Sequence, residues 1–142
     1  MGVADGEPWY YFGMEKTGVI FALICDEKIL MQQRDGNCKQ FPFMWCLPGG
    51  ESEEGEHCEV TLLREVKEEY DIDLKIEQCR HFMDYNGGND KVYFCKINSN
   101  QEPKLKEGLA MKWMMINEIE KLKLGFHQEG IIPVLKTLIT NI

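Results

Sequence analysis

The sequence predicts a mixed α/β fold, because segments with strand-like and helix-like hydrophobic patterns alternate along its 142 residues. Four segments have the apolar content and the turn-bounded length of strands: Gly18–Cys25, Lys28–Arg34, Lys75–Tyr85 and Lys91–Asn98. The sequence Asn86-Gly87-Gly88-Asn89 separates the last two and is a strong hairpin-turn signal. Between the two strand pairs, the acidic stretch that ends at Tyr70 has helical periodicity. The chain is therefore expected to combine a β-sheet with helices.

The remaining elements are predicted from the same kinds of pattern. In chain order they are a loop (35–40), an apolar and aromatic segment (41–47), a tight turn at Pro48-Gly49-Gly50, a short strand (111–116) and a helix (117–122). The two glycines of the turn permit a close backbone approach to a ligand or metal. The tail from His127 to Ile142 has apolar residues at helical spacing, and Pro133 fits only within the first turn of such a helix.

The composition suits one domain with its own hydrophobic core, since 44% of the residues are hydrophobic and 28% are charged. No stretch approaches the roughly 18 apolar residues of a membrane span, so no membrane partner is expected. The start of the chain, MGVADGEPWYY, lacks the features of a secretory signal. The six cysteines contain no C-x-x-C pair, which argues against a zinc site. Reduced structural thiols in a cytoplasmic protein are the expectation.

The net charge of −8 is concentrated in one segment. Between Glu51 and Asp73 there are ten acidic residues and two basic ones, and the rest of the chain is balanced. Contacts to nucleic-acid phosphates need Lys and Arg, so sequence-specific nucleic-acid binding is not expected. A focused acidic patch attracts cations instead.

Three glutamates lie within about one helical turn of this segment: Glu65, Glu68 and Glu69. On a helix they share a face, nearly opposite an expected apolar stripe of Val60, Leu63, Val66 and Tyr70. Like charges at this spacing repel by about 0.2–0.5 kcal/mol per pair, and neither Glu65 nor Glu69 has a basic residue four positions away. A solvated surface therefore explains the cluster poorly. Carboxylate oxygens at this density suit Mg²⁺, with Mn²⁺ as the alternative.

Residues 50–72, GESEEGEHCEVTLLREVKEEYDI, resemble the signature of the Nudix hydrolases, and the MutT-like members in particular. The matching positions are Gly50, Glu56, Arg64, Glu65, Val66, Glu68, Glu69 and Ile72. Asp71 departs from the family's glycine at a position that is expected to need a left-handed backbone, which Asp tolerates. The resemblance implies an α/β/α sandwich with a mixed sheet flanked by helices, and a single Nudix domain over residues 1–142.

The resemblance also implies roles for individual residues. The expected metal ligands are Gly50, Glu56, Glu65, Glu68 and Glu69, and the expected catalytic residues are Glu65, Arg64 and Glu107. Arg34 is expected to bind the substrate through a phosphate. The planar fork of Arg64 is expected to hold a glutamate, namely Glu65. Glu107 is assigned from a loop that carries a further catalytic glutamate in some members, and an ordinary loop acid is the alternative.

The implied activity is divalent-metal-dependent hydrolysis of a nucleoside diphosphate linked to another moiety. A nucleoside triphosphate, giving a nucleoside monophosphate and pyrophosphate, is the default substrate, because no signature of another subfamily is present. The alternatives are a nucleotide sugar, a dinucleoside polyphosphate or capped RNA, and an inactive nucleotide sensor of the same fold. The expected partner is a small-molecule nucleotide, and the expected state is a monomer or a homodimer.

Overall fold

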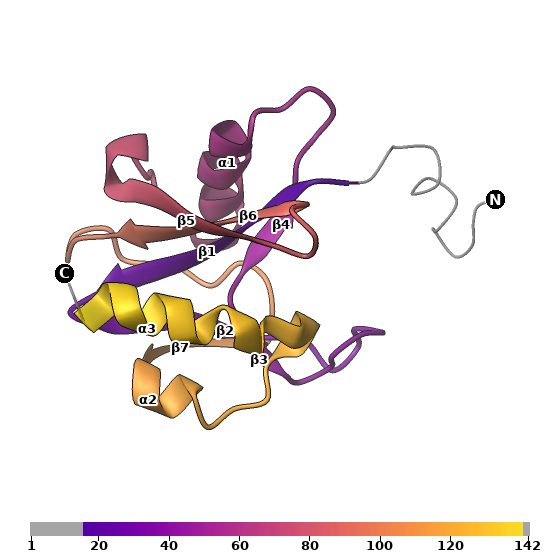
Figure 1. The fold of residues 1–142 in the computed structure, drawn as a ribbon, viewed down its shortest axis with the longest axis vertical. Helices are drawn as coiled ribbons and strands as arrows, with labels where there is room; N and C mark the ends of the chain where they lie inside the picture. Colours follow the sequence, from indigo (N-terminus) through magenta and orange to yellow (C-terminus); the bar gives the residue numbers. More distant parts are fainter. Residues whose placement is uncertain (1–15, 141–142) are drawn as a thin grey trace.

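The computed structural model describes residues 16–140 and shows a mixed sheet with helices on both faces (Figure 1). The strands are β1 (Gly18–Cys25), β2 (Lys28–Gln33), β3 (Trp45–Cys46), β4 (Gly49–Glu51), β5 (Cys79–Tyr85), β6 (Asp90–Lys96) and β7 (Ala110–Met115). The α-helices are α1 (Cys58–Tyr70), α2 (Ile116–Ile119) and α3 (Ile132–Thr140), and the 3-10 helices are η2 (Ile76–Gln78) and η3 (Gly125–Gly130). The α/β prediction, with helices on both faces of a mixed sheet, is confirmed.

The sheet is mixed because one central pair of strands is parallel. Its main order is β3-β2-β1-β6-β5, while β4 pairs with β1 and β7 pairs with β2. Strands β1 and β6 run parallel from Gly18↔Asp90 to Ile24↔Lys96, and the other pairs are antiparallel. A parallel pair needs a long connection, and α1 lies within it.

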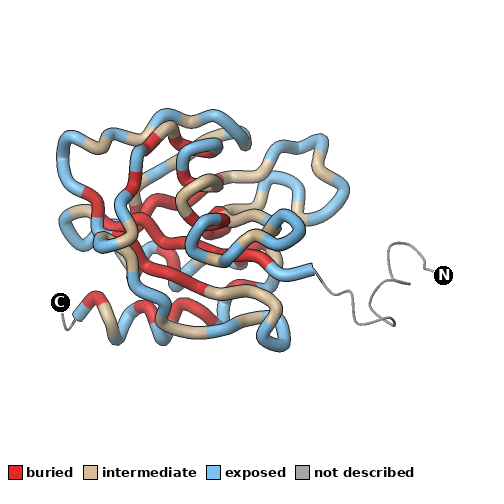
Figure 2. Tube along the Cα trace, turned by 90° about the horizontal axis from the view of Figure 1, so that it is seen from above, coloured by how far each residue is buried: buried red, intermediate tan, exposed pale blue. Residues whose placement is uncertain are grey.

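Strand β1 is buried on both faces, which explains its uninterrupted apolar sequence. Val19, Phe21 and Leu23 belong to a core cluster that includes buried residues of α1. The alternate residues of β1 belong to a second cluster, which includes buried residues of α3. Successive side chains point to opposite faces of a strand, so one strand supplies both cores. Figure 2 shows the buried chain running through the middle of the molecule.

The structure corrects three details of the predicted elements. Gly49 and Gly50 lie in β4, paired with β1, and not in an isolated tight turn. The strand expected from Lys75 begins at Cys79, because Ile76–Gln78 forms a 3-10 turn. The tail helix begins at Ile132, after a segment in which two residues have positive φ, and Pro133 does lie in its first turn. Ile142 lies outside the described residues.

The turn between β5 and β6 and the short strand β7 occur where the sequence indicates them. Within the described part of the chain, no helix has the length and apolar character needed to cross a membrane.

Candidate active site

Helix α1 carries the glutamates of the signature, but the face that it buries differs from the prediction. Val60, expected in the apolar stripe, is 55% exposed, whereas Glu69, expected opposite the stripe, is only 4% exposed. The buried face is centred on Leu62 and Val66, and Glu69 lies on it because it follows Leu62 by seven residues, or about two turns. Glu69 therefore sits against the sheet, while Glu68 is half exposed.

His57 and Asp71 cap the two ends of α1. The side chain of His57 accepts a hydrogen bond from the backbone N–H of Glu59, so this histidine takes the role that Ser or Thr often has. Asp71 has φ 58° and ψ 38°, which confirms the left-handed conformation expected where the family has glycine. Its backbone N–H donates to the carbonyl of Lys67. The substitution of Gly by Asp is therefore compatible with a regular helix end.

Arg64 forms hydrogen bonds with several residues of the acidic segment. Its Nε and Nη2 donate to the two carboxylate oxygens of Glu56 at 2.8 Å each, and its Nη1 donates to Glu65 at 3.0 Å and to Glu68 at 3.2 Å. Nη2 also donates to the backbone carbonyl of Glu51 at 3.0 Å. The two-pronged partner is thus Glu56, and Glu65 receives a single bond from the same guanidinium. The expected contact between Arg64 and Glu65 is therefore present, but the two-point contact is made with Glu56, which approaches Arg64 from the loop before the helix.

Glu56 is held by several donors besides Arg64. It accepts hydrogen bonds from the Glu53 backbone N–H at 2.9 Å and from the Thr61 hydroxyl at 2.8 Å. The hydrogen bond from Arg64 is the main reason why the pKa of Glu56 falls to about 2, and the Glu53 N–H adds to it. The pKa of Arg64 is raised in turn. This network joins the loop before α1 to the first turns of the helix.

Gly50 in β4 leaves room for the carboxylate of Glu65. A Cβ atom at Gly50 would lie 2.1 Å from the carboxyl carbon of Glu65 and 2.3 Å from each of its oxygens. Any side chain at this position would displace Glu65. The glycine is therefore required by a close approach between strand and helix.

The side chains of Glu65 and Glu69 lie one turn apart on α1, close enough for each to affect the pKa of the other. Burial raises the pKa of Glu69 well above its usual range, and the nearby Glu65 and Glu107 raise it further. Burial also raises the pKa of Glu65, against the opposing effect of Arg64. Two carboxyl groups in contact share a proton or need a cation, so this pair has the chemistry of a cation site.

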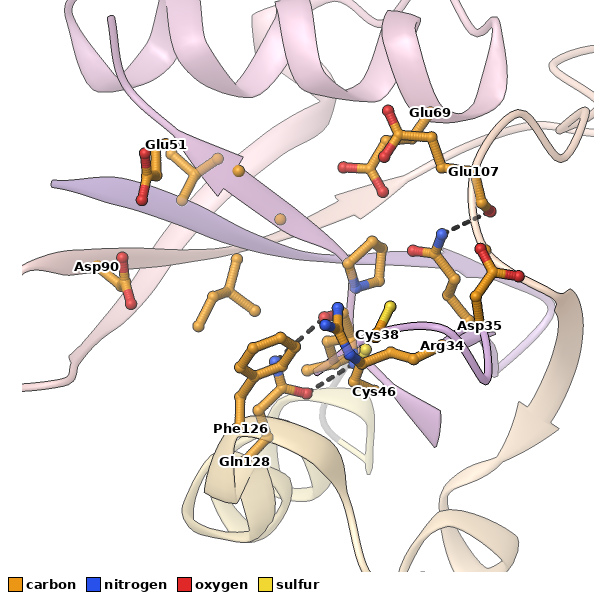
Figure 3. A pocket seen from close by; sticks show the side chains of 18 of the residues that line it. Arg34, Asp35, Cys38, Cys46, Glu51, Glu69, Asp90, Glu107, Phe126 and Gln128 are labelled. Carbon is orange, nitrogen blue, oxygen red and sulfur yellow. Dashed lines mark hydrogen bonds between the residues drawn. The ribbon is translucent and has the colours of Figure 1, made fainter. Parts of the chain in front are cut away.

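A cavity of about 750 Å³ opens beside Glu69 (Figure 3). Glu69 and Glu107 lie next to each other at one end of it, and Arg34 and Phe126 lie together at the other. Gly49 and Gly50 also line the cavity, whereas Glu56, Arg64, Glu65 and Glu68 do not. The structure thus brings Glu69, Glu107, Gly50 and Arg34 to one pocket.

Arg34 is held at the far end of the pocket by two contacts. Its Nε donates to the backbone carbonyl of Gln40 at 3.0 Å, and its guanidinium lies 4.5 Å from the centre of the Phe126 ring. Phe41 packs against Phe126, and their ring centres lie 5.0 Å apart. Both phenylalanines have positive φ, near 54° and 58°. Such backbone strain in bulky residues is usual where a fixed side chain serves a binding site.

Several residues of the site were not identified from the sequence. Gln128 is 2% exposed and pairs with Leu47 through two hydrogen bonds, from the Leu47 N–H at 2.7 Å and to the Leu47 carbonyl at 3.1 Å. Gln32 is 8% exposed and donates to the backbone carbonyl of Glu107 at 2.7 Å. Thr61 was also missed. A polar residue inside an apolar strand, such as Gln32 after Ile29–Met31, was the available signal.

The residues present fit a magnesium ion by their chemistry. No three His, Cys, Asp or Glu side chains among residues 16–140 converge into a complete metal cage. Mg²⁺ does not require one, because it is usually bound by one or two carboxylates and keeps several waters and substrate oxygens. The Glu65–Glu69 pair, with Gly50 beside Glu65 and Glu107 next to Glu69, offers that kind of partial ligand set.

The comparison with known families agrees with this geometry. A family model described as the NUDIX domain matches residues 14–135. This range contains the signature helix, the glycines of β4 and the loop that carries Glu107. The chain belongs to the Nudix family.

Individual relatives are distant. The Caenorhabditis elegans protein named "Putative nudix hydrolase 1" is 28% identical over 119 residues, which cover 80% of this chain and 31% of that protein. The chain thus spans about a third of the length of this curated relative.

Solved structures share the fold. A MutT structure, from work on Aliivibrio salmonicida and Vibrio cholerae, has a TM-score of 0.67 at 21% identity and covers 89% of this chain and 98% of that one. A C. elegans Ap4A hydrolase has a TM-score of 0.65 at 19% identity, with 90% and 100% covered. Similarity at this level shows a common architecture.

Proposed function

We propose that this chain catalyses divalent-metal-dependent hydrolysis of a nucleoside diphosphate linked to another moiety. A nucleoside triphosphate is the substrate that we favour, with a nucleoside monophosphate and pyrophosphate as products. The observation that carries the proposal is one pocket in which Glu69 and Glu107 lie together, directly beside the Glu65–Arg64 pair of the Nudix signature.

In this proposal Glu65 and Glu69 hold Mg²⁺ with the backbone of Gly50, and Glu68 contributes from the exposed side of α1. The ion, when bound, would neutralise phosphate charge and polarise the reacting phosphorus. Glu56 acts differently from the metal-ligand role that was expected for it. Its oxygens accept hydrogen bonds from Arg64, Thr61 and Glu53, so it positions Arg64.

The protein's own groups supply orientation and proton transfer. The Glu107 carboxylate, at the edge of the pocket, accepts a proton from the attacking water. Arg64 orients Glu65 and is the positioning residue of the ligand set. Away from the two glutamates, Arg34 presents its Nη groups to a phosphate of the substrate while its guanidinium packs against the Phe126 ring. The substrate would thus span the pocket between the glutamates and Arg34.

The experiment that tests this function is a substrate panel. The purified chain is incubated with Mg²⁺ and nucleoside triphosphates, ADP-ribose, nucleotide sugars, dinucleoside polyphosphates or capped RNA, and the products are identified by mass spectrometry. Hydrolysis in ¹⁸O-water should place label in one phosphate-containing product. A nucleoside triphosphate should yield pyrophosphate, and not orthophosphate, as the primary product.

A matched control separates catalysis from contamination. Glu69→Gln should abolish turnover, while Glu120→Gln, far along the chain in an exposed ion pair with Lys136, should not. Binding of nucleotides without turnover by the unaltered chain, under every metal tested, would favour the inactive sensor instead.

A further inference from the structure

We infer that Gln32 is a positioning residue that ties the Glu107 loop to the glutamate helix α1 and thereby sets the Glu107 carboxylate beside Glu69. This inference rests on the proposed function, because it concerns how the two glutamates are held for it. The side chain that makes this connection comes from β2, outside residues 50–72.

The loop that carries Glu107 is fastened on both sides by its backbone. The N–H of Lys104 donates to the carbonyl of Tyr70 at 2.9 Å, and the N–H of Lys106 donates to the carbonyl of Glu69 at 3.0 Å. These two bonds also serve carbonyls at the C-terminal end of α1, which lack partners within the helix. After Glu107, the N–H of Leu109 donates to the carbonyl of Gln33 at 2.8 Å. The loop therefore bridges α1 and β2.

Gln32 supplies the contact at Glu107 itself. Its Nε2 donates to the Glu107 carbonyl at 2.7 Å, and its Oε1 accepts from the hydroxyl of Tyr70 at 3.4 Å. Gln32 is 8% exposed and Tyr70 is fully buried. The tyrosine hydroxyl favours the amide orientation in which the NH₂ group faces Glu107. A flipped amide would set its oxygen against the Glu107 carbonyl, which is unfavourable at low exposure.

The neighbouring glycine confirms how closely the loop approaches β2. Gly108 has φ +87°, and a Cβ atom there would lie 2.7 Å from Gln32 Nε2 and 2.9 Å from the Gln33 carbonyl oxygen. The chain passes over Gln32 at a distance that only glycine permits. The Glu107 carbonyl thus lies in close contact with the Gln32 amide that donates to it. Gln32 also lines the same pocket as Glu69 and Glu107.

The chain of contacts runs from Tyr70, directly after Glu69 on α1, through Gln32 to Glu107. Because Tyr70 is buried in the core, its position fixes both Glu69 and the amide of Gln32. The spacing between the two glutamates is therefore set by a side chain that bears no charge.

The test replaces Gln32 by methionine, which has a similar shape and cannot donate a hydrogen bond. Gln33→Met is the matched control, because Gln33 is the adjacent glutamine and its Nε2 donates to the Phe43 carbonyl at 3.0 Å, away from Glu107. With the best nucleotide of the panel, kcat of Gln32→Met should fall by about tenfold to a hundredfold, as expected for a misplaced catalytic group, and KM should stay within about twofold. Gln33→Met should keep both constants.

A double variant shows whether Gln32 acts through Glu107. If it does, Gln32→Met combined with Glu107→Gln should be no slower than Glu107→Gln alone. Tyr70→Phe removes the hydroxyl that orients the Gln32 amide but leaves the Gln32 NH₂ donor in place. This variant should therefore lose less activity than Gln32→Met. Additive losses in the double variant, an unchanged kcat in Gln32→Met, or a wild-type rate in Glu107→Gln would overturn the inference.

A measurement without metal or substrate keeps this result separate from the proposed function. Hydrogen–deuterium exchange of segment 104–109 should be faster in Gln32→Met than in the unaltered chain, and unchanged in Gln33→Met. If no nucleotide is hydrolysed at all, the proposed function fails and exchange alone decides whether Gln32 holds the loop. Equal exchange in all three proteins would overturn the inference.

Discussion

The carboxylate of Glu65 occupies the space that a side chain at Gly50 would take, since a Cβ atom there would come within 2.3 Å of both Glu65 oxygens. Strand β4 and helix α1 thus meet where Gly50 faces the Glu65 carboxylate. The missing side chain at Gly50 leaves room for this carboxylate next to the sheet. The two adjacent glycines differ in what they approach. A Cβ at Gly49 would instead meet the backbone carbonyl oxygen of Val19 in β1 at 2.2 Å.

This difference predicts opposite phenotypes for two alanine variants. Gly50→Ala should reduce activity by about a hundredfold or more, because Glu65 is displaced, with a small change in melting temperature. Gly49→Ala should lower the melting temperature more, because backbone cannot yield as a side chain can. Steady-state kinetics and thermal unfolding of both proteins check the contrast. A Gly50→Ala protein with full activity would contradict the placement of Glu65 in the site.

Replacing the buried carboxyl of Glu69 should remove the stabilisation that a bound metal gives, without unfolding the metal-free protein. Glu69→Gln keeps the shape of the side chain and replaces a buried carboxyl group whose pKa is raised by burial and by neighbouring carboxyl groups, so the metal-free fold should survive. Activity should fall by about a hundredfold or more. For the unaltered chain, Mn²⁺ or Mg²⁺ should raise the melting temperature and EDTA should reverse the rise. The variant should show little of this shift, and an undiminished shift would exclude Glu69 as a ligand.

Arg64→Lys should lose the hydrogen-bond geometry of the guanidinium while keeping its charge. A lysine ammonium cannot hold Glu56 with two parallel bonds and reach Glu65 as well. We expect kcat to fall at least about tenfold and the free energy of unfolding to fall by about 1–2 kcal/mol, since several charge-assisted hydrogen bonds are lost at a mostly buried site. Kinetics and denaturant unfolding test this, and a wild-type rate would show that the positive charge suffices.

The low pKa of Glu56 predicts a pH dependence of stability. A carboxyl whose pKa falls on folding from 4.5 to about 2 stabilises the fold fully above the higher value, and this contribution is lost as the pH falls toward the lower one. Glu56→Gln places an amide where Arg64 needs two acceptors, so it should melt at a lower temperature than the unaltered chain at pH 7. The difference should shrink below pH 4.5. A difference that is constant from pH 7 to pH 3 would contradict the ion pair.

The local parts of the structure were predictable from sequence, and the long-range parts were not. The β1 strand, the hairpin turn at Asn86 and the left-handed Asp71 follow from side-chain pattern and backbone sterics within a few residues. The buried position of Glu69 depends on where the sheet and residues 104–107 meet α1. Helical periodicity alone does not predict where these contacts form. The pocket itself escaped prediction for the same reason, as Arg34 meets Phe126, more than ninety positions later in the chain.

The parallel pairing of β1 with β6 has a consequence for how this chain acquires its fold. Each contact between Gly18–Ile24 and Asp90–Lys96 closes a loop of about seventy residues, and such distant contacts slow folding. During synthesis the centre of the sheet cannot form until β6 has emerged from the ribosome. The segment of α1 has already been synthesised by then, but an isolated helix of 13 residues is marginal in water, so it depends on the sheet that buries its apolar face. The ten acidic residues between Glu51 and Asp73 keep this segment strongly charged while its apolar face is uncovered, and such charge opposes aggregation.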